Sequence, residues 1–258
     1  MDTLKVSFIQ SDLVWENTKA NLNNFEEKIK TISSDIDLII LPEMFTTGFS
    51  MNAKVLAEDI SGRTVQWMQK IAISKDCAIT GSIIIEEDGL YFNRLIFMYP
   101  SGEFKHYDKR HTFTLANEHK TFTAGNKKVI LNYKGWKICP LICYDLRFPA
   151  WARNQEDYDL LIYIASWPKK RIAAWDALLK ARAIENMSYT IGVNRIGKDG
   201  NDYEYVGHSV IYDALGNDIT EINNEVSCVI SVELDKNEQN ITRSKLGFLN
   251  DKDSFIIQ

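Results

Sequence analysis

The sequence lacks the patterns that mark several common functional classes. No apolar run approaches the roughly 18 residues of a membrane-spanning helix, and the opening residues MDTLKVSFIQ show neither the basic nor the apolar region of a secretory signal. The motifs GxGxxG and GxxxxGK[ST], which bind dinucleotides and phosphates, do not occur. The GxSxG turn of many serine hydrolases is missing too. We therefore expect a cytoplasmic protein with no membrane partner.

Metal and disulfide sites are not indicated either. None of the four histidines falls in HExxH or another compact ligand spacing, and the four cysteines include no CxxC pair. Cys139 and Cys143 lie on one predicted strand, where four residue steps separate them by roughly 13 Å, too far for a disulfide. We expect no metal and no cofactor, and we predict that Cys77 and Cys228 pack as small apolar side chains.

The sequence has no excess of positive charge: it contains 30 Lys and Arg residues and 35 Asp and Glu residues, which gives a net charge of −5. Since no block of basic residues occurs, the sequence does not predict nucleic-acid binding. With 258 residues, 45% of them hydrophobic, the chain can bury a core without a metal or disulfide. No Pro-, Gly- or Ser-rich linker interrupts it, so we predict a single domain over residues 1–258, with a core at about 4–235 and a C-terminal tail.

Hydrophobic periodicity predicts an α/β protein in which strands and helices alternate early and strands dominate later. A helix capped by Asn17 buries Leu22, Phe25, Ile29 and Ile32, and segment 103–126 has no clear period and is interpreted as a long loop. Further helices are predicted at 62–75, 149–155 and 173–188. Strands are predicted at 4–10, 36–43, 77–87, 90–99, 128–133, 136–143, 159–165, 189–196, 207–213 and 226–234.

Three segments contain residue types suited to catalysis. LPEMFTTGFS (41–50) places Glu43 at the end of a buried strand, HYDKRHTF (106–113) is a basic turn, and LICYDLRFP (141–149) places Cys143 at another strand end. Strand ends are where α/β proteins hold reactive groups, and a helix start beside Cys143 would favour its thiolate. Each segment alone also fits a structural role: a solvated Glu, a solvated turn or a Cys packed in the core.

In combination and in order, LPE at 41–43, Asp-Lys at 108–109 and ICYDLRFP at 142–149 resemble the carbon–nitrogen hydrolases of the nitrilase superfamily. The resemblance extends from about residue 4 to about residue 235. It implies a catalytic triad of Glu43, Lys109 and Cys143. It also implies a further family carboxylate at Glu118, within LANEHKTFTAG, for which a surface Glu on a helical turn is the alternative.

Within that superfamily the chain is similar to the omega-amidases, also called 2-oxoglutaramate amidases. The segments that carry this similarity are YIASWPKKR (163–171), WDALLKARAIEN (175–186) and VNRIGKDGN (193–201). Omega-amidases hydrolyse the distal amide of 2-oxoglutaramate or 2-oxosuccinamate. The tail departs from the usual pattern, because GFLND stands where an aromatic-Pro pair is expected.

The resemblance implies covalent catalysis, which divides the hydrolysis of an unreactive amide into two easier steps. Cys143 is the expected nucleophile, and Glu43 takes its proton, returns one to the departing ammonia and later activates water. A buried setting that raises the pKa of Glu43 would suit this task. Lys109 and the backbone N–H of Tyr144 are expected to stabilise the oxyanion, while Glu118 orients Lys109.

Substrate binding is predicted for Tyr144, through its backbone N–H, and for four further residues. The planar guanidinium of Arg147 suits a carboxylate, but an ion pair with Asp145 or with a partner chain fits equally well. An aromatic wall of the pocket is expected from Trp167, Phe49 and Phe113, for which plain packing is the alternative.

By the same resemblance, the fold is a four-layer α-β-β-α sandwich with mixed sheets, and helix 173–188 contributes to a homodimer. The predicted function is that of an omega-amidase that forms a Cys thioester and needs only a small-molecule amide as its partner. Two alternatives are another carbon–nitrogen hydrolase, such as an N-carbamoyl or aliphatic amidase, and a catalytically silent binding protein on the same fold. The presence of all three triad residues disfavours the silent protein.

Overall fold

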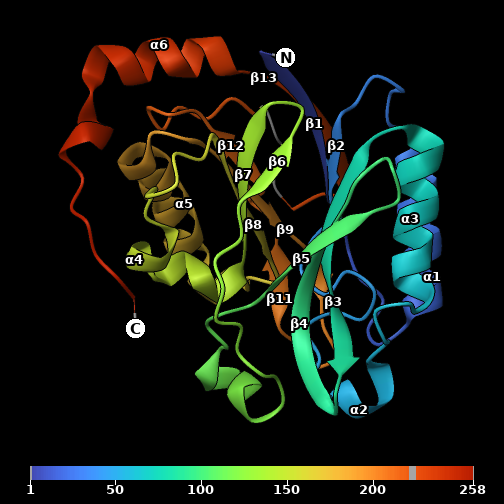
Figure 1. Ribbon diagram of the computed structural model, residues 1–258. Helices are drawn as coiled ribbons and strands as arrows, with labels where there is room; N and C mark the ends of the chain where they lie inside the picture. Colours follow the sequence, from blue (N-terminus) through green and yellow to red (C-terminus); the bar gives the residue numbers. More distant parts are fainter. Residues whose placement is uncertain (1, 221–224, 258) are drawn as a thin grey trace.

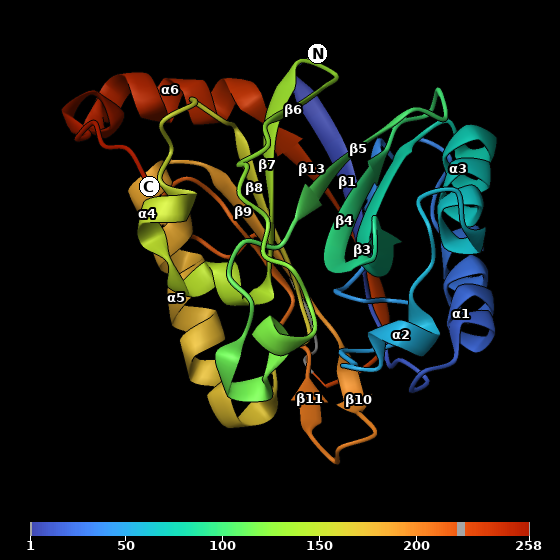
Figure 2. The same ribbon diagram turned by 60° about the horizontal axis from the view of Figure 1, so that its bottom comes forward.

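The computed structural model describes residues 2–220 and 225–257 of the chain. Two sheets dominate this part of the protein and lie face to face (Figure 1). The first has the strand order β13-β1-β2-β3-β4-β5, the second has the order β12-β9-β8-β7-β6, and the small β10-β11 hairpin projects beyond them (Figure 2). The first sheet contains β1 (Thr3–Gln10), β2 (Leu38–Ile40), β3 (Ala78–Glu87), β4 (Leu90–Met98), β5 (Phe104–Asp108) and β13 (Cys228–Asp235). The remaining strands are β6 (Leu131–Tyr133), β7 (Trp136–Ile142), β8 (Leu160–Ala165), β9 (Tyr189–Asn194), β10 (Ile196–Lys198), β11 (Glu204–Val206) and β12 (Val210–Tyr212).

Helices cover the outer face of each sheet. The first sheet is covered by α1 (Thr18–Lys30) and α3 (Arg63–Lys75), and the second by α4 (Pro149–Ala152) and α5 (Ile172–Asn186) (Figure 1). The order of layers is therefore α-β-β-α, which confirms the predicted fold class. Shorter or peripheral helices are α2 (Ala53–Leu56), α6 (Lys236–Leu246), η1 (Thr114–Ala116), η2 (Glu118–Lys120), η3 (Cys143–Arg147), η4 (Lys169–Arg171) and η5 (Phe248–Asp251).

The core forms on both faces of the sheets. Along β1, the side chains of Val6 and Phe8 enter the apolar cluster between the two sheets. Ile9 points to the opposite face and packs with Phe25 of α1 in a second apolar cluster. Because successive side chains of a strand alternate between faces, a strand buried on both sides must be apolar almost throughout.

Parallel pairing decides where the functional loops lie. In the first sheet β2 pairs in parallel with β1 and β3, and in the second β8 pairs in parallel with β7 and β9. The carboxyl ends of parallel strands meet at one edge of a sheet. The loops after β7 and β8 therefore lie at one end of the second sheet, and the Ser166 N–H after β8 binds Glu43 after β2, so the β2 loop lies at the same end.

Most helix predictions are confirmed. The side chain of Asn17 accepts a hydrogen bond of 3.0 Å from the Ala20 N–H and so caps α1. The predicted inward residues of α1 and α3 are buried, with Leu22, Phe25 and Met68 among them. Burial of one apolar face against the sheet holds each of these helices in place.

Three local predictions are wrong. Segment 103–126 contains the strand β5 as well as turns, and β5 escaped notice because it is an edge strand in which only Tyr107 is buried. Strand 36–43 shortens to β2 (Leu38–Ile40). Cys228 is predicted to be buried, but it is partly exposed on the edge strand β13. The prediction for Cys77 is confirmed, because this free cysteine is buried.

The tail that periodicity left unassigned forms α6, which crosses one end of the sandwich (Figure 1). The side chain of Asp235 caps its first turn, and Gly247 ends it in the left-handed region at φ +66°. Among the described residues, none of the helices combines the length and the apolar content needed to span a bilayer.

Candidate active site

Glu43 lies in the turn that follows β2 and is fully buried. Its Oε1 accepts hydrogen bonds from Lys109 Nζ at 2.9 Å and from Asn93 Nδ2 at 2.8 Å. Its Oε2 accepts the Ser166 backbone N–H at 2.8 Å. A solvated Glu at a strand exit is therefore the wrong description, because protein donors replace the water that this carboxylate would otherwise bind.

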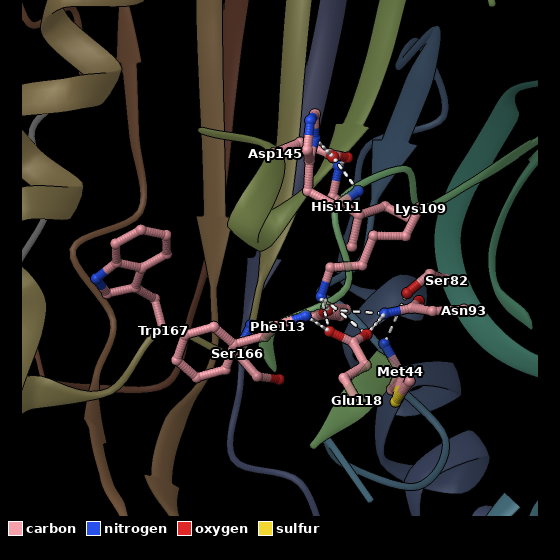
Figure 3. Close-up of polar contacts among 12 residues, drawn as sticks. Met44, Ser82, Asn93, Lys109, His111, Phe113, Glu118, Asp145, Ser166 and Trp167 are labelled. Atoms are coloured by element: carbon pink, nitrogen blue, oxygen red, sulfur yellow. Dashed lines mark hydrogen bonds and ion pairs between the residues drawn. The ribbon is translucent and has the colours of Figure 1, made fainter. Parts of the chain in front are cut away.

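The Glu43 turn is held in place from β3. The backbone N–H of Met44, the next residue, donates to the Ser82 hydroxyl at 2.9 Å, as Figure 3 shows. The backbone N–H of Phe45 donates to the Ser82 carbonyl at 3.1 Å, and the Phe45 ring packs in the core with Phe25. Met44 adopts φ +43°, a strained conformation for a residue with a side chain, and these contacts hold it there.

Lys109 follows directly on β5 and is also fully buried. Besides Glu43, its ammonium group contacts both carboxylate oxygens of Glu118, at 3.0 and 2.9 Å (Figure 3). Burial alone would lower the pKa of Lys109, but the carboxylates of Glu118 and Glu43 outweigh burial and raise the pKa above its ordinary value. Lys109 therefore carries a permanent positive charge between two buried carboxyl groups.

Glu118 begins η2 and has no solvent exposure, so it is not a surface Glu on a helical turn. In addition to its contacts with Lys109, it accepts the Phe113 backbone N–H at 2.5 Å. Burial raises the pKa of Glu118, and Lys109 only partly opposes that effect. The residue joins the loop that follows β5 to the lysine side chain, which fits the predicted orienting role.

Cys143 stands where β7 ends and η3 begins, at φ +46°. This left-handed conformation is costly for a non-glycine residue, and here it turns the side chain into a cavity. The turn is fixed by Arg182 of α5, whose guanidinium donates to the Leu146 carbonyl at 2.6 Å.

The electrostatic setting of Cys143 contradicts the expectation of a favoured thiolate. Burial raises the pKa of the Cys143 thiol well above its ordinary value. The negative charge of the Glu43 carboxylate raises this pKa further, and Lys109 only partly opposes the rise. At neutral pH the resting group is a thiol, so attack on a substrate requires a base, and Glu43 is the adjacent base.

Asp145 connects the cysteine turn to the lysine loop. Its Oδ1 accepts from the His111 backbone N–H at 3.0 Å and contacts His111 Nδ1 at 2.8 Å (Figure 3). Its Oδ2 accepts from the Tyr107 hydroxyl at 2.8 Å and from the Ile142 N–H at 3.1 Å. The carboxylate is fully buried and its partners come from both sheets. Because these partners occupy Asp145, the alternative in which it pairs with Arg147 is not realised.

A cavity of about 600 Å³ opens in front of Cys143. All five residues predicted to bind substrate line it: Phe49, Phe113, Tyr144, Arg147 and Trp167. Their side chains pack on one another, with the Phe113 and Tyr144 rings 4.9 Å apart and the Arg147 guanidinium carbon 4.9 Å from the centre of the Trp167 ring. The Phe49 ring faces the Lys109 ammonium at 5.1 Å. Their location at the cavity is thus observed, while their roles stay predictions.

Sequence reasoning missed Asn93 and Ser166. Asn93 belongs to β4 and, besides binding Glu43, lies 3.4 Å from Glu118 Oε1 (Figure 3). The available signal was an amide, next to Arg94, within the mostly apolar YFNRLIFM strand. Ser166 acts through its backbone N–H, and a main-chain donor carries no signal in the residue type.

The described residues offer no cluster of three or more His, Cys, Asp or Glu side chains that could hold a metal ion. The site instead brings together a thiol, an ammonium group and two carboxyl groups, beside an arginine-bearing cavity. This set provides a nucleophile, a base and fixed positive charge, which is what acyl transfer from an amide requires.

Comparison with known sequences identifies a match over almost the entire chain. The sequence model of the carbon-nitrogen hydrolase family matches residues 5–243. Omega-amidase YafV from Yersinia enterocolitica is 40% identical over 259 aligned positions, which cover 100% of both chains. A 2-oxoglutaramate amidase from Bacillus subtilis is 32% identical, with 95% of this chain and 96% of that protein aligned.

Comparison with solved structures agrees. A CN-hydrolase superfamily protein from Xanthomonas campestris, whose crystal structure contains an arsenic adduct in the active site, superimposes with a TM-score of 0.97. The two chains are 38% identical, and the alignment covers 100% of each. The arrangement of layers described above is therefore shared by a solved relative over its full length.

Proposed function

Because this chain belongs to the carbon-nitrogen hydrolase family, we propose that it is an omega-amidase acting on dicarboxylate monoamides such as 2-oxoglutaramate and 2-oxosuccinamate. The products are the 2-oxo diacid and ammonia. The observation that carries this proposal is the full-length identity of 40% to an omega-amidase, joined to a cavity-lining thiol whose pKa is shifted by the paired Glu43 carboxylate and Lys109 amine.

Acylation begins with the neutral Cys143 thiol. Its sulfur attacks the amide carbon while its proton passes to Glu43. This attack forms the C–S bond and leaves a tetrahedral oxyanion. When the C–N bond breaks, Glu43 returns the proton to the departing nitrogen, so ammonia leaves and a thioester remains. The raised pKa of the thiol explains why a base next to the sulfur is needed.

We assign the proton-carrying atom as Oε2 of Glu43. A carboxylate oxygen has two lone pairs in its plane, and both on Oε1 are taken, by Lys109 and by Asn93. Oε2 has one hydrogen bond, from the Ser166 N–H, and keeps one lone pair for the cysteine proton. The same atom then takes a proton from the water that hydrolyses the thioester.

Lys109 stabilises the oxyanion together with the Tyr144 N–H. One ammonium proton serves Glu43 and one is shared by the two Glu118 oxygens, which leaves the third for the substrate. Tyr144 is the second residue of η3, in the first turn, where backbone N–H groups have no acceptor within the helix. Losing one donor of this kind typically costs about 2.7–4 kcal/mol of barrier.

Arg147 is proposed to bind the substrate carboxylate. Its guanidinium lies on the Trp167 ring at the cavity, and Asp145 is occupied elsewhere. An aromatic face orients the planar guanidinium and leaves its edge free for a carboxylate. Phe49 and Phe113 then enclose the short apolar chain between the carboxylate and the amide.

The test is ammonia release from 2-oxoglutaramate, with glutamine, asparagine and a simple nitrile as comparison substrates. We expect 2-oxoglutaramate to have the highest kcat/KM, and we expect Cys143→Ala to abolish its turnover. Cys77→Ala is the matched control, because that thiol is buried far along the chain from the cavity and does not line it. Turnover by a folded Cys143→Ala variant would refute the covalent mechanism. A nitrile or a simple amide as the best substrate would refute the assignment to omega-amidase.

We also propose that the protein is one domain that acts as a homodimer in the cytoplasm. Four free thiols fit a reducing compartment. Large apolar side chains are exposed on α5, α6 and the following tail, which favours burial against a second copy. They are Ile184, Ile241, Phe248 and Ile256. Light scattering after gel filtration measures the mass in solution, and a monomer at micromolar concentration would contradict this part.

A further inference from the structure

A second guanidinium lines the cavity besides that of Arg147. Arg171 is the last residue of η4, on the connection from β8 to α5. Its guanidinium carbon lies 5.0 Å from the centre of the Phe113 ring, and its backbone carbonyl accepts the Trp167 indole N–H at 2.9 Å. The side chain is therefore positioned by the same aromatic residues that form the wall of the cavity.

Neither guanidinium of the cavity forms an ion pair within the part of the chain that the structure describes. Within residues 2–220 and 225–257, Arg147 and Arg171 contact aromatic rings and have no carboxylate within ion-pair distance. By contrast, carboxylates pair with Arg94, Arg182, Arg195 and Arg243. The carboxylates of Glu16 and Asp199 also line the cavity, but they accept from the Ser50 and Tyr205 hydroxyls and not from either arginine. The two guanidinium groups therefore keep their donors for an anion.

We propose that Arg171 is a specificity-determining residue that selects 2-oxo acids over 2-amino acids. The inference rests on the proposed omega-amidase function and on Arg147 as the partner of the carboxylate. A 2-oxo acid presents three acceptor oxygens on two adjacent carbons. One guanidinium edge binds two of them, so a second guanidinium is needed to bind the 2-oxo oxygen.

The same geometry opposes an amino acid amide. Glutamine replaces the 2-oxo acceptor by an ammonium group, which places a cation and three donors against a guanidinium that has only donors. A site with a mismatched polar partner rejects a substrate much more strongly than a site that merely lacks a contact. The monoamide of glutaric acid, which has hydrogens at that carbon, provides the neutral reference.

The experiment compares kcat and KM for 2-oxoglutaramate, the glutaric acid monoamide and glutamine. Arg171→Gln should raise KM for 2-oxoglutaramate about 10- to 100-fold, the loss expected for one charge-assisted hydrogen bond, with kcat within about threefold. KM for the glutaric acid monoamide should change less than about threefold. The ratio of kcat/KM for 2-oxoglutaramate to kcat/KM for glutamine should fall by about the same factor as kcat/KM for 2-oxoglutaramate.

Lys170→Gln is the matched control, because it removes one positive charge from the neighbouring exposed residue, which does not line the cavity. It should leave all three KM values unchanged. Arg171→Lys keeps the charge without the planar edge, and should raise KM for 2-oxoglutaramate by a smaller factor. If the Gln variant does not fold, the Lys variant must still affect 2-oxoglutaramate more than the glutaric acid monoamide.

The outcomes separate the two proposals. A wild-type protein that does not hydrolyse 2-oxoglutaramate refutes the proposed function, and this inference falls with it. An active wild type whose Arg171→Gln variant keeps its KM, or loses affinity equally for 2-oxoglutaramate and the glutaric acid monoamide, refutes the inference alone. The second pattern would mean that Arg171 supplies charge or holds Phe113, without recognising the 2-oxo group.

Discussion

Asn93 offers the sharpest test of how the buried charges are arranged, because two isosteric groups at this position should behave in opposite ways. Its side-chain amide donates to Glu43 Oε1 at 2.8 Å and lies 3.4 Å from Glu118 Oε1. Its own Oδ1 has no partner among the described residues. Asn93→Asp keeps the shape of the side chain but replaces the donor by a carboxyl group facing two carboxyl groups.

The magnitude follows from the lost contact. A hydrogen bond to a charged acceptor contributes about 1.5–3 kcal/mol. Because each 1.4 kcal/mol or so corresponds to a factor of ten in rate, Asn93→Ala should lower kcat about 10- to 100-fold. Asn93→Asp should lower kcat further at neutral pH, since it adds repulsion to the loss. Both variants should bind substrate nearly as well as the wild type, because Asn93 does not line the cavity.

The activity of Asn93→Asp should depend on pH in a direction that identifies the role of the amide. Burial and the neighbouring Glu43 and Glu118 carboxylates raise the pKa of a carboxyl group introduced at position 93. Below that raised pKa the group is protonated and donates a hydrogen bond as the amide does, so Asn93→Asp should regain activity as the pH falls. Asn93→Ala should show no such recovery. If Asn93→Asp is as active as Asn93→Ala at neutral pH, or shows no gain on acidification, the amide does not act as a donor to Glu43.

Two further predictions concern the thiol and the packing of α5. Because the pKa of Cys143 is raised, its thiol should be neutral at pH 7. The ultraviolet absorbance spectrum of the wild type, after subtraction of the Cys143→Ala spectrum, should then contain no thiolate band at pH 7. A thiolate band in that difference spectrum would contradict the neutral thiol. In β9, a Cβ at Gly192 would lie 2.3 Å from Leu179 Cδ1 and 2.8 Å from Trp175 Cζ2. Gly192→Ala should therefore lower the free energy of unfolding by about 1–3 kcal/mol in denaturant titration, and an unchanged midpoint would show that α5 shifts freely.

The elements that could be predicted from the sequence are those whose burial dictates their composition. Strands β7 and β8 are buried on both faces and appear as apolar runs, and Asn17 marks the start of α1 through a local hydrogen bond. Glu43, Lys109 and Cys143 could be selected as candidate catalytic residues because each belongs to a recognisable sequence motif. The family, the fold class and the omega-amidase relationship agree with the comparisons.

The elements that could not be predicted depend on contacts between distant parts of the chain. In β5 only Tyr107 is buried, so the strand has no apolar alternation to indicate it. In α6 only Gln239 is buried, and the helix is held by its Asp235 cap and by the ion pair of Arg243 with Asp159. Neither feature gives a periodic apolar pattern.

The site itself is divided between the two sheets, and this division determines what controls its geometry. Glu43, Asn93 and Lys109 come from elements of the first sheet, whereas Cys143 and Ser166 follow strands of the second. The nucleophile and its base are thus on separate layers, and their approach depends on how the sheets pack.

Several polar links cross between those layers at the site, among them the His111 N–H that donates to Asp145, and two bear directly on Glu43 and on the cysteine turn. The Ser166 N–H binds Glu43, and Tyr107 of β5 binds Asp145, two residues after Cys143. Both links are buried and made with short hydrogen bonds, so they fix the spacing of the layers where apolar packing alone would allow small shifts. A protein that holds a neutral thiol against a carboxylate needs that spacing held within a fraction of an ångström, because the proton must move between them in each half of the reaction. The buried Asp145 network is therefore part of what sets the distance between nucleophile and base, although neither Asp145 nor Tyr107 lines the cavity.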